Sequence, residues 1–316
     1  MRYYTNVQMV GNDFLVRGYE NGKSFTSRES FQPTMFVPSK KKTKYRTLDG
    51  NYVQSIQPGT VRETREFIRS HDNVENFEIY GNNRYIYQYI SDRYPENEIK
   101  FDLKKMNLVT IDIEVKSENG FPTVEKCDEE MLLISLQDYN TKRILTFGVG
   151  PYRTQDKMVK YVQCNDEYDM LTHFINYWSK TPPEVVTGWN CQLYDIPYLA
   201  KRITRVLGDK ACKKLSPWGL VTHEEIYMAG RPHLMYDIGG VTVLDYMDLY
   251  KKFTYKAQES YRLDYIGEVE LGQKKLDHSE HDTFKEFYTK AWNKFVDYNI
   301  QDVRIVDGLE EKMKLI

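Results

Sequence analysis

The sequence has little cysteine and no long apolar run, and both absences exclude whole classes of protein. Only four of the 316 residues are cysteine, and their wide scatter lacks the spacing of a zinc site or a disulfide framework. No stretch approaches the roughly 18 consecutive apolar residues of a membrane-spanning helix. The first residues are polar and rich in tyrosine, unlike a secretory signal. We therefore expect a cytoplasmic protein in a reducing compartment.

An excess of charge of one sign is also missing. Lysine and arginine total 44, aspartate and glutamate total 46, and the formal net charge is −2. This balance excludes a globally basic nucleic-acid coat and a strongly acidic disordered tail. The Gly-x-x-x-x-Gly-Lys-Ser/Thr loop of nucleotide-binding ATPases does not occur either. What is present is a 41% apolar content, which is enough to bury a sizeable core, in a chain long enough for two domains.

The first third of the chain has the pattern of short strands and turns. The Asn21-Gly22 pair favours a tight hairpin turn. Thr60 and Glu63 have the spacing of a capping box, which predicts that a short helix begins there. We interpret the aromatic-rich segment 85–90 as a strand. The basic run at 40–46 is better explained as a solvated loop than as a phosphate-contacting patch, and both interpretations stay open.

The rest of the chain alternates short apolar runs with helical patterns, which is typical of an α/β domain. Strands are expected at 108–115, 131–136, 143–149, 184–189 and 241–244. Helices are expected at 167–178, at about 195–206 and from 292 to near the end of the chain. In the first of these helices, Met170, Phe174 and Tyr177 form the expected apolar stripe. We therefore predict a strand-rich α+β domain over residues 1–102 and an α/β domain over residues 103–316.

Two carboxylates lie on a predicted buried strand. Asp112 and Glu114 are two residues apart, so both side chains point to the same face of the strand. Two carboxylates among valines and isoleucines need a compensating cation unless they face water at the end of the strand. Asp-x-Glu alone is weak evidence, because Asp128 and Glu130 have the same spacing in a loop-like stretch.

Two further acidic residues lie at informative positions, one between a predicted strand and a predicted helix and one on the terminal helix. Asp195 follows a predicted strand and precedes a predicted helix, where it is either a helix N-cap or part of a ligand site. Tyr298 and Asp302 are four apart on the terminal helix, so the phenol and the carboxylate share one face. Each signal alone is also explained by a structural role. Together they indicate two-metal hydrolysis of a phosphodiester, in which four carboxylates hold two hard divalent cations, Mg²⁺ or Mn²⁺.

These residues, in this order, resemble the motifs of a known family. Asp112-Ile113-Glu114, the segment 190–195 and the segment 298–302 are similar to the three exonuclease motifs of family-B DNA polymerases. Further similar stretches narrow the resemblance to the polymerases of T-even-type tailed phages; they are 33–36, 120–122, 187–190, 244–253 and 260–266. The resemblance covers essentially the whole chain. It implies a ribonuclease-H-like 3′→5′ exonuclease domain, a mixed sheet flanked by helices, after a smaller N-terminal domain.

The resemblance also implies roles for the acidic residues. Asp112, Glu114 and Asp302 would hold one metal ion, and Asp112 with Asp195 would hold the other. Tyr298 would position the water that attacks the phosphodiester. Lys275 is our candidate for the family's lysine near the scissile phosphate, although the segment from this lysine to Tyr298 does not align without a gap.

Three more residues would contact the DNA strand. Phe121 resembles the family's residue that stacks on a base of the frayed strand, although an ordinary loop aromatic is the alternative. Asn190 and Tyr194 would contact the terminal nucleotides. Stacking tolerates any base, as an editing site requires.

The sequence lacks the family's palm motif, Tyr-x-Asp-Thr-Asp, and its lysine-rich fingers segment. We therefore expect no polymerisation from this chain, whether it is a fragment or one half of a split polymerase. The leading hypothesis is an exonuclease on single-stranded or frayed 3′ DNA ends, acting in the cytoplasm of an infected cell beside the remaining polymerase portion. The alternative is a nucleic-acid-binding module without catalysis, with messenger RNA as a partner.

Overall fold

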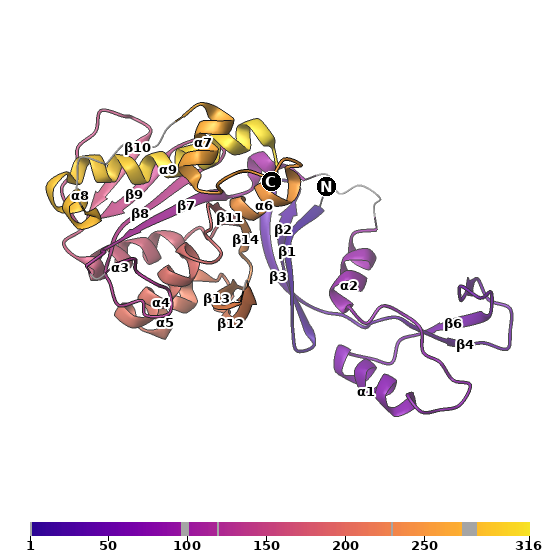
Figure 1. Ribbon diagram of the computed structural model, residues 1–316. Helices are drawn as coiled ribbons and strands as arrows, with labels where there is room; N and C mark the ends of the chain where they lie inside the picture. The colour runs from indigo at the N-terminus through magenta and orange to yellow at the C-terminus, as the bar shows by residue number, and fades with distance from the viewer. Residues whose placement is uncertain (1, 96–100, 119, 229, 274–282) are drawn as a thin grey trace. The chain divides into compact units, whose positions relative to one another are not determined.

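The computed structural model describes all residues except 1, 96–100, 119, 229 and 274–282 (Figure 1). The chain separates into two compact units, Met1–Leu103 and Lys104–Ile316. Each unit has its own sheets and its own hydrophobic core. In the described part of the chain, no helix is both long and apolar enough to cross a membrane.

The first unit contains two small antiparallel sheets and two helices. One sheet has the order β1-β2-β3 and the other the order β4-β6-β5. The strands are β1 (Arg2–Val10), β2 (Asp13–Glu20), β3 (Lys23–Ser30), β4 (Met35–Pro38), β5 (Tyr45–Arg46) and β6 (Tyr52–Ile56). Asn21 and Gly22 connect β2 to β3 with φ of 51° and 78°. Both angles are positive, as a type I′ turn requires, so the predicted hairpin turn is confirmed.

Helix α1 (Val61–His71) begins where the sequence predicts it. The Thr60 amide donates to Glu63 Oε2 at 2.7 Å, and the Thr60 hydroxyl accepts from the Glu63 amide. This reciprocal pair is a complete capping box. The basic run at 40–46 crosses an exposed loop and enters the short strand β5.

The segment predicted as the strand 85–90 is instead helix α2 (Tyr85–Arg93), so that prediction was wrong. Tyr85 and Tyr89 are four residues apart and both are buried. Tyr89 stacks on Phe14 of β2, with ring centroids 4.8 Å apart. Aromatic residues favour strands on average, but here their helical spacing brings two large rings into the core of the unit, and that packing outweighs propensity.

The second unit is built on a six-stranded mixed sheet in the order β10-β9-β8-β7-β11-β14. The strands are β7 (Leu108–Val115), β8 (Met131–Asp138), β9 (Ile144–Gly148), β10 (Val159–Gln163), β11 (Val185–Gly188) and β14 (Thr242–Asp245). Strand β8 is antiparallel to both of its neighbours, and the other pairs are parallel. The predicted mixed sheet of an α/β fold is therefore confirmed.

Helices cover both faces of this sheet (Figure 1). The long α9 (Trp292–Met313) packs on one face, over β7, β8 and β9. Helices α3 (Glu167–Trp178) and α4 (Asp195–Leu207) pack on the other face. Within β7, Ile111 and Ile113 join the core on the α3 and α4 side, so the residues between them point toward α9. We call these two sides the α9 face and the α3 face.

Smaller elements complete the second unit. They are α5 (Asp209–Cys212), η2 (Lys213–Leu215), the hairpin of β12 (Val221–Met228) and β13 (Arg231–Ile238), α6 (Tyr246–Phe253), α7 (Leu263–Leu271) and α8 (Phe284–Lys290). The short turn η1 (Leu103–Lys105) spans the boundary between the two units. Helices α7 and α8 both pack on α9. Tyr246, Ile266 and Ile305 bury their side chains together where α6, α7 and α9 meet. These contacts fix the position of α9 on the sheet.

Candidate metal centre

Strand β7 points two carboxylates at the α9 face. Asp112 and Glu114 alternate with Ile111 and Ile113, whose side chains are buried on the opposite face. Both carboxylates are half-buried. The alternation of the strand therefore points both acids to one side, as the sequence predicts, and the structure shows that this side faces α9.

Helix α9 brings a third carboxylate to the same place. The Asn299 side-chain amide donates to Asp112 Oδ2 at 2.6 Å, which joins the helix to the strand. Asp302 follows within one turn and is buried. Ligand oxygens of Asp112, Glu114 and Asp302 all lie within 4.8 Å of one another. Three carboxylates this close suit a hard divalent cation, because all the donors are oxygen and a cation offsets their mutual repulsion.

Asp195 reaches this region from the first residue of α4. Its Oδ1 accepts a hydrogen bond from the Ile113 amide at 3.0 Å, midway between the two acids of β7. Tyr194 holds the N-cap position and no side chain caps the helix, so the N-cap interpretation of Asp195 was wrong. Burial raises the pKa of Asp195 to about 7, and repulsion from Asp245 and Asp302 adds to the rise while the Ile113 amide opposes it.

A buried acid that the sequence reasoning missed holds the loop before Asp195. Asp245 ends β14, and its Oδ1 accepts from the amides of Asn190 at 3.1 Å and Met247 at 3.0 Å. Its Oδ2 accepts from the Gln192 amide at 3.0 Å. Asn190 itself has a φ of 63°, in the left-handed region. The N-cap of α6 was readable from Asp245 before a helical pattern, but its bonds to a loop more than 50 residues away were not.

Two aromatic residues lie beside the carboxylates. The Phe121 ring is 78% exposed, and its centroid is 5.4 Å from that of Tyr194. Tyr194 also packs on Tyr198 of α4 at 5.7 Å. Burial raises the pKa of the Tyr194 phenol, and the neighbouring Asp195 carboxylate raises it further. The structure thus places Phe121 and Tyr194 together, with one ring open to solvent.

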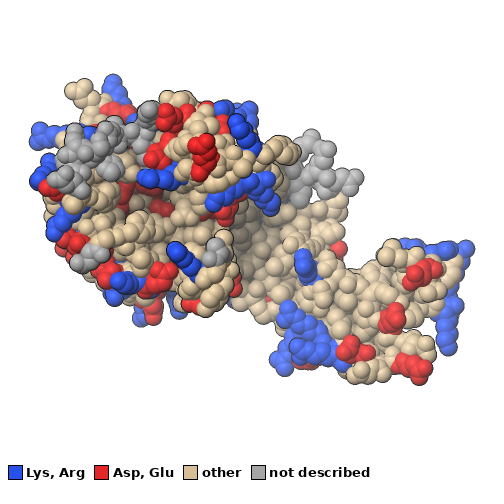
Figure 2. All heavy atoms as spheres, viewed as in Figure 1, with Lys and Arg blue, Asp and Glu red and all other residues tan. Residues whose placement is uncertain are grey.

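The remaining predicted residues have different outcomes. Tyr298 is half-buried on α9, one turn before Asp302, and its ring meets that of Phe287 edge-on at 5.8 Å. Asn190 is half-buried in the loop that Asp245 holds. Lys275 lies outside the described residues. Acidic and basic side chains are interspersed over the face of the molecule shown in Figure 2, in line with the small net charge.

Comparison with known proteins matches the chain to a family. Residues 60–266 match the model of the DNA polymerase family B exonuclease domain, which is well over half of the chain. This chain belongs to that family. The matched segment includes β7, β11 and the start of α4, and therefore three of the four carboxylates discussed above.

Individual relatives agree with this membership of family B. The chain is 28% identical to the DNA-directed DNA polymerase of Enterobacteria phage T4 over 98% of its length, and 28% identical to that of Escherichia phage RB69 over 99%. It is 25% identical to a putative DNA polymerase of Frog virus 3 over 67%. The chain spans only 37% of the length of either phage polymerase. The comparisons give no support to RNA as a partner.

Proposed function

We propose that this chain is a metal-dependent 3′→5′ exonuclease of ribonuclease-H-like fold, corresponding to the proofreading portion of a DNA-directed DNA polymerase. Residues 103–316 would carry the activity and residues 1–102 would form the accompanying N-terminal domain. The observation that carries the proposal is the convergence of Asp112, Glu114 and Asp302, from a strand and a helix far apart in sequence, to within 4.8 Å. The substrate would be single-stranded DNA or a frayed 3′ end, cut to nucleoside monophosphates.

The four carboxylates together would hold two cations. Asp112, Glu114 and Asp302 would hold one, and Asp112 with Asp195 would hold the other. The two ions, Mg²⁺ or Mn²⁺, supply an activated water and stabilisation of the leaving oxygen. The Asn299 amide fixes the Asp112 carboxylate, and the Ile113 amide fixes that of Asp195. Both donors hold a ligand oxygen in place before substrate arrives, which is what a preorganised site requires.

The side chains around the carboxylates would bind and orient the DNA end. The exposed Phe121 ring can stack on a base, a contact worth about 1–3 kcal/mol that tolerates any sequence. Asn190 and Tyr194 would contact the terminal nucleotides. Tyr298 would orient the attacking water, because a phenol both donates and accepts hydrogen bonds. The remaining polymerase portion is the proposed protein partner, and the cytoplasm of an infected cell is the proposed location.

The proposal is tested by incubating the protein with end-labelled single-stranded DNA, with Mg²⁺ or with a chelator. Stepwise shortening from the 3′ end is expected only with the metal. Replacing both Asp112 and Glu114 with alanine should lower the rate by about a thousandfold or more, since the metal contribution is several kcal/mol. The matched control is the double replacement of Asp128 and Glu130, which have the same spacing on exposed positions.

The outcomes separate the candidate functions. Full activity in the Asp112→Ala/Glu114→Ala variant would overturn the assignment of the site. Metal-independent binding of DNA without shortening would favour the alternative, a binding module that does not catalyse. Loss of activity in the Asp128→Ala/Glu130→Ala control as well would show that the effect is not specific to the cluster.

A further inference from the structure

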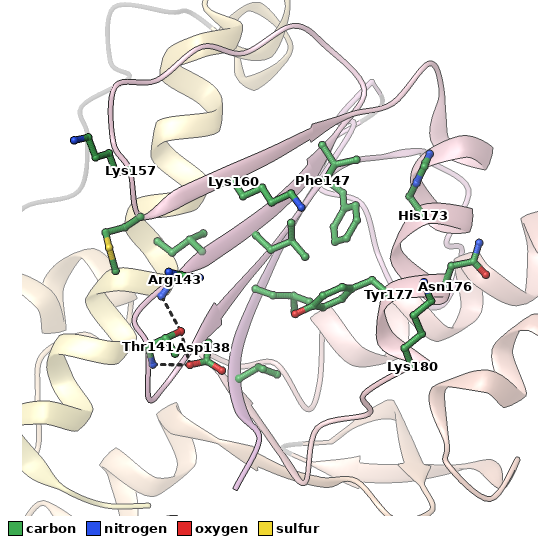
Figure 3. Close-up of a pocket in the computed structure, with 16 residues that line it drawn as sticks. Asp138, Thr141, Arg143, Phe147, Lys157, Lys160, His173, Asn176, Tyr177 and Lys180 are labelled. Atoms are coloured by element: carbon green, nitrogen blue, oxygen red, sulfur yellow. Dashed lines mark hydrogen bonds between the residues drawn. The ribbon is translucent and has the colours of Figure 1, made fainter. Parts of the chain in front are cut away.

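A second candidate site lies on the α3 face of the six-stranded sheet. A pocket of about 580 Å³ opens beside α3, over β8, β9 and β10 (Figure 3). Val109 of β7 contributes to its floor, and strand alternation places Val109 on the face opposite to Asp112. The pocket also lies at the end where β7 begins, because Val109 pairs with Asp138 on β8. It is therefore separate from the carboxylate cluster, which belongs to the α9 face.

The rim of this pocket is basic. Four lysine and arginine side chains line it, together with His173; they are Arg143, Lys157, Lys160 and Lys180. All four are exposed. None of them forms an ion pair with any carboxylate that the structure describes. The one acidic lining residue is Asp138, whose Oδ1 already accepts from the Thr141 amide and hydroxyl at 2.6 and 2.7 Å.

The floor of the pocket is apolar and includes aromatic rings. Phe147 of β9 is buried, whereas Tyr177 of α3 keeps 45% of its surface exposed. Their ring centroids are 6.1 Å apart. Figure 3 shows Tyr177 reaching from α3 over the strands, with Arg143 and Lys160 on the strand side and Lys180 on the helix side. An exposed ring thus shares the pocket with cationic side chains that pair with no carboxylate among the described residues.

We propose that this pocket binds a phosphate-bearing nucleotide, either free or as one unit of a single-stranded nucleic acid. The base would lie on the Tyr177 ring, and the phosphate would lie among Arg143, Lys160 and Lys180. Aromatic platforms combined with a basic groove are the usual elements of single-strand recognition. The volume lies in the range of about 300–1,000 Å³ typical of small-ligand pockets. An acidic peptide would satisfy the cations but would give the exposed ring no flat partner, so the nucleotide is the better fit.

This proposal does not depend on the proposed exonuclease activity, because the two sites share no residue. The test therefore uses binding with a chelator present, where no metal-dependent cleavage occurs. The probe is a fluorescently labelled oligothymidylate at low salt, and its anisotropy reports binding. Unlabelled thymidine monophosphate, inorganic phosphate and poly-glutamate serve as competitors. A photo-reactive thymidine analogue in the probe, cross-linked and mapped by mass spectrometry, reports which pocket the base enters.

Two sets of variants isolate the cations and the ring. The triple variant Arg143→Gln/Lys160→Gln/Lys180→Gln should weaken binding by about tenfold or more at low salt and flatten its salt dependence. The matched control is Lys210→Gln/Lys213→Gln/Lys214→Gln, which removes three exposed cations outside the pocket.

For the ring, Tyr177→Ala should weaken binding by about tenfold, and Tyr177→Phe should retain it, because the ring and not the hydroxyl carries the contact. The control is Tyr168→Ala, which removes an exposed tyrosine from the same helix. Cross-links should map to the peptide that contains Tyr177.

Each outcome decides the proposal. Competition by thymidine monophosphate indicates a site for a free nucleotide, whereas binding of the oligomer alone indicates a single-strand site. The proposal is overturned if the Arg143 triple variant binds like its lysine control, or if Tyr177→Ala binds like Tyr168→Ala. Preferential binding of poly-glutamate would overturn it in favour of a protein partner. Displacement by inorganic phosphate as efficiently as by the nucleotide would overturn the role of the ring.

Discussion

The two faces of the six-stranded sheet carry opposite charge, and the charged residues lie on different strands. On the α9 face, Asp112 and Glu114 of β7 meet Asp302 of the helix. On the α3 face, Lys160 of β10 and Arg143 beside β9 surround a pocket with an exposed tyrosine. The net charge of −2 sums over the whole chain and so does not report the sign of the charge on either face. A near-neutral chain can therefore present an acidic cluster and a cationic pocket within one domain.

The different helical cover of the two faces explains this contrast. Helix α9 spans 22 residues and lies across β7, β8 and β9, so side chains on that face are held between helix and sheet. Helix α3 spans 12 residues and leaves part of β9 and β10 uncovered beside it, where the pocket opens. The closely covered face fixes carboxylate geometry, whereas the open face leaves room for a ligand.

The largest effect is expected from breaking the buried ion pair between Glu167 of α3 and Arg202 of α4. Glu167 accepts from the Arg202 guanidinium, with Nε at 2.8 Å, and from the Met131 amide at 2.8 Å. Both charged side chains are under 10% exposed. Glu167→Ala should lower the free energy of unfolding by about 3–5 kcal/mol, because it leaves a buried guanidinium unpaired. Urea unfolding measures this.

Lys290→Ala is the matched control, since it breaks an exposed pair with Glu286 on α8 and should cost at most about 0.5 kcal/mol. Equal free energies of unfolding for Glu167→Ala and Lys290→Ala would show that the Glu167–Arg202 pair does not stabilise the fold.

An intermediate effect is expected from replacing Asp245. The replacement should affect the carboxylate site and leave the α3-face pocket unaffected. Asp245→Ala leaves the amides of Asn190 and Gln192 without their acceptor, so the loop before Asp195 should lose its geometry. We expect metal-dependent cleavage to fall by about 10- to 100-fold, equivalent to the roughly 1–3 kcal/mol of unsatisfied buried groups. Nucleotide binding at the α3-face pocket should be unchanged.

Asp248→Ala, an exposed acid in the first turn of the same helix, is the control for Asp245. A similar small loss in both variants would mean that Asp245 does not position the loop.

The smallest effect is expected from Asp307 of α9, and it concerns the pH dependence of stability. Burial raises the pKa of the Asp307 carboxyl above its ordinary value, although Lys142 at 2.6 Å opposes the rise. Because the folded pKa is the higher one, the stabilising contribution is fully present below the unfolded value of about 4 and is lost as the pH rises through the folded pKa. Asp307→Asn should therefore reduce the change of melting temperature with pH above about pH 4, the unfolded value.

Thermal unfolding over a pH series measures this slope, with Asp297→Asn as an exposed control on the same helix. An unchanged slope in Asp307→Asn would show that Asp307 does not contribute to the pH dependence of stability.

The sequence predicted five of the six strands of the large sheet and the helices α3, α4 and α9, but not β10, the β12–β13 hairpin or the helices α6, α7 and α8. Periodicity located β7, α3 and α9, and strand alternation placed Asp112 and Glu114 on one side. Two further misses depend on contacts between distant segments. The apolar stripe of α3 was expected to include Tyr177, but the ring lies at the edge of the covered area and stays exposed. The Asp245 bonds to the 190–192 loop join residues more than 50 positions apart, which no local pattern reports.

The error in the first unit has a related cause. The aromatic content of 85–90 favoured a strand, while the spacing of Tyr85 and Tyr89 favoured a helix. Only the core formed with Phe14 decides between these two signals. A prediction from one sequence weighs composition and spacing without knowing which neighbours will be available.

The hydrogen bond from the Ile113 amide to Asp195 has a consequence for how this domain tolerates change. A shift of β7 by one residue would turn every side chain to the other side and exchange the isoleucines for the acids. It would also move the Ile113 amide that donates to Asp195. Insertions and deletions in the turns that flank β7 should therefore accumulate among homologues, whereas the length of the strand itself should not vary.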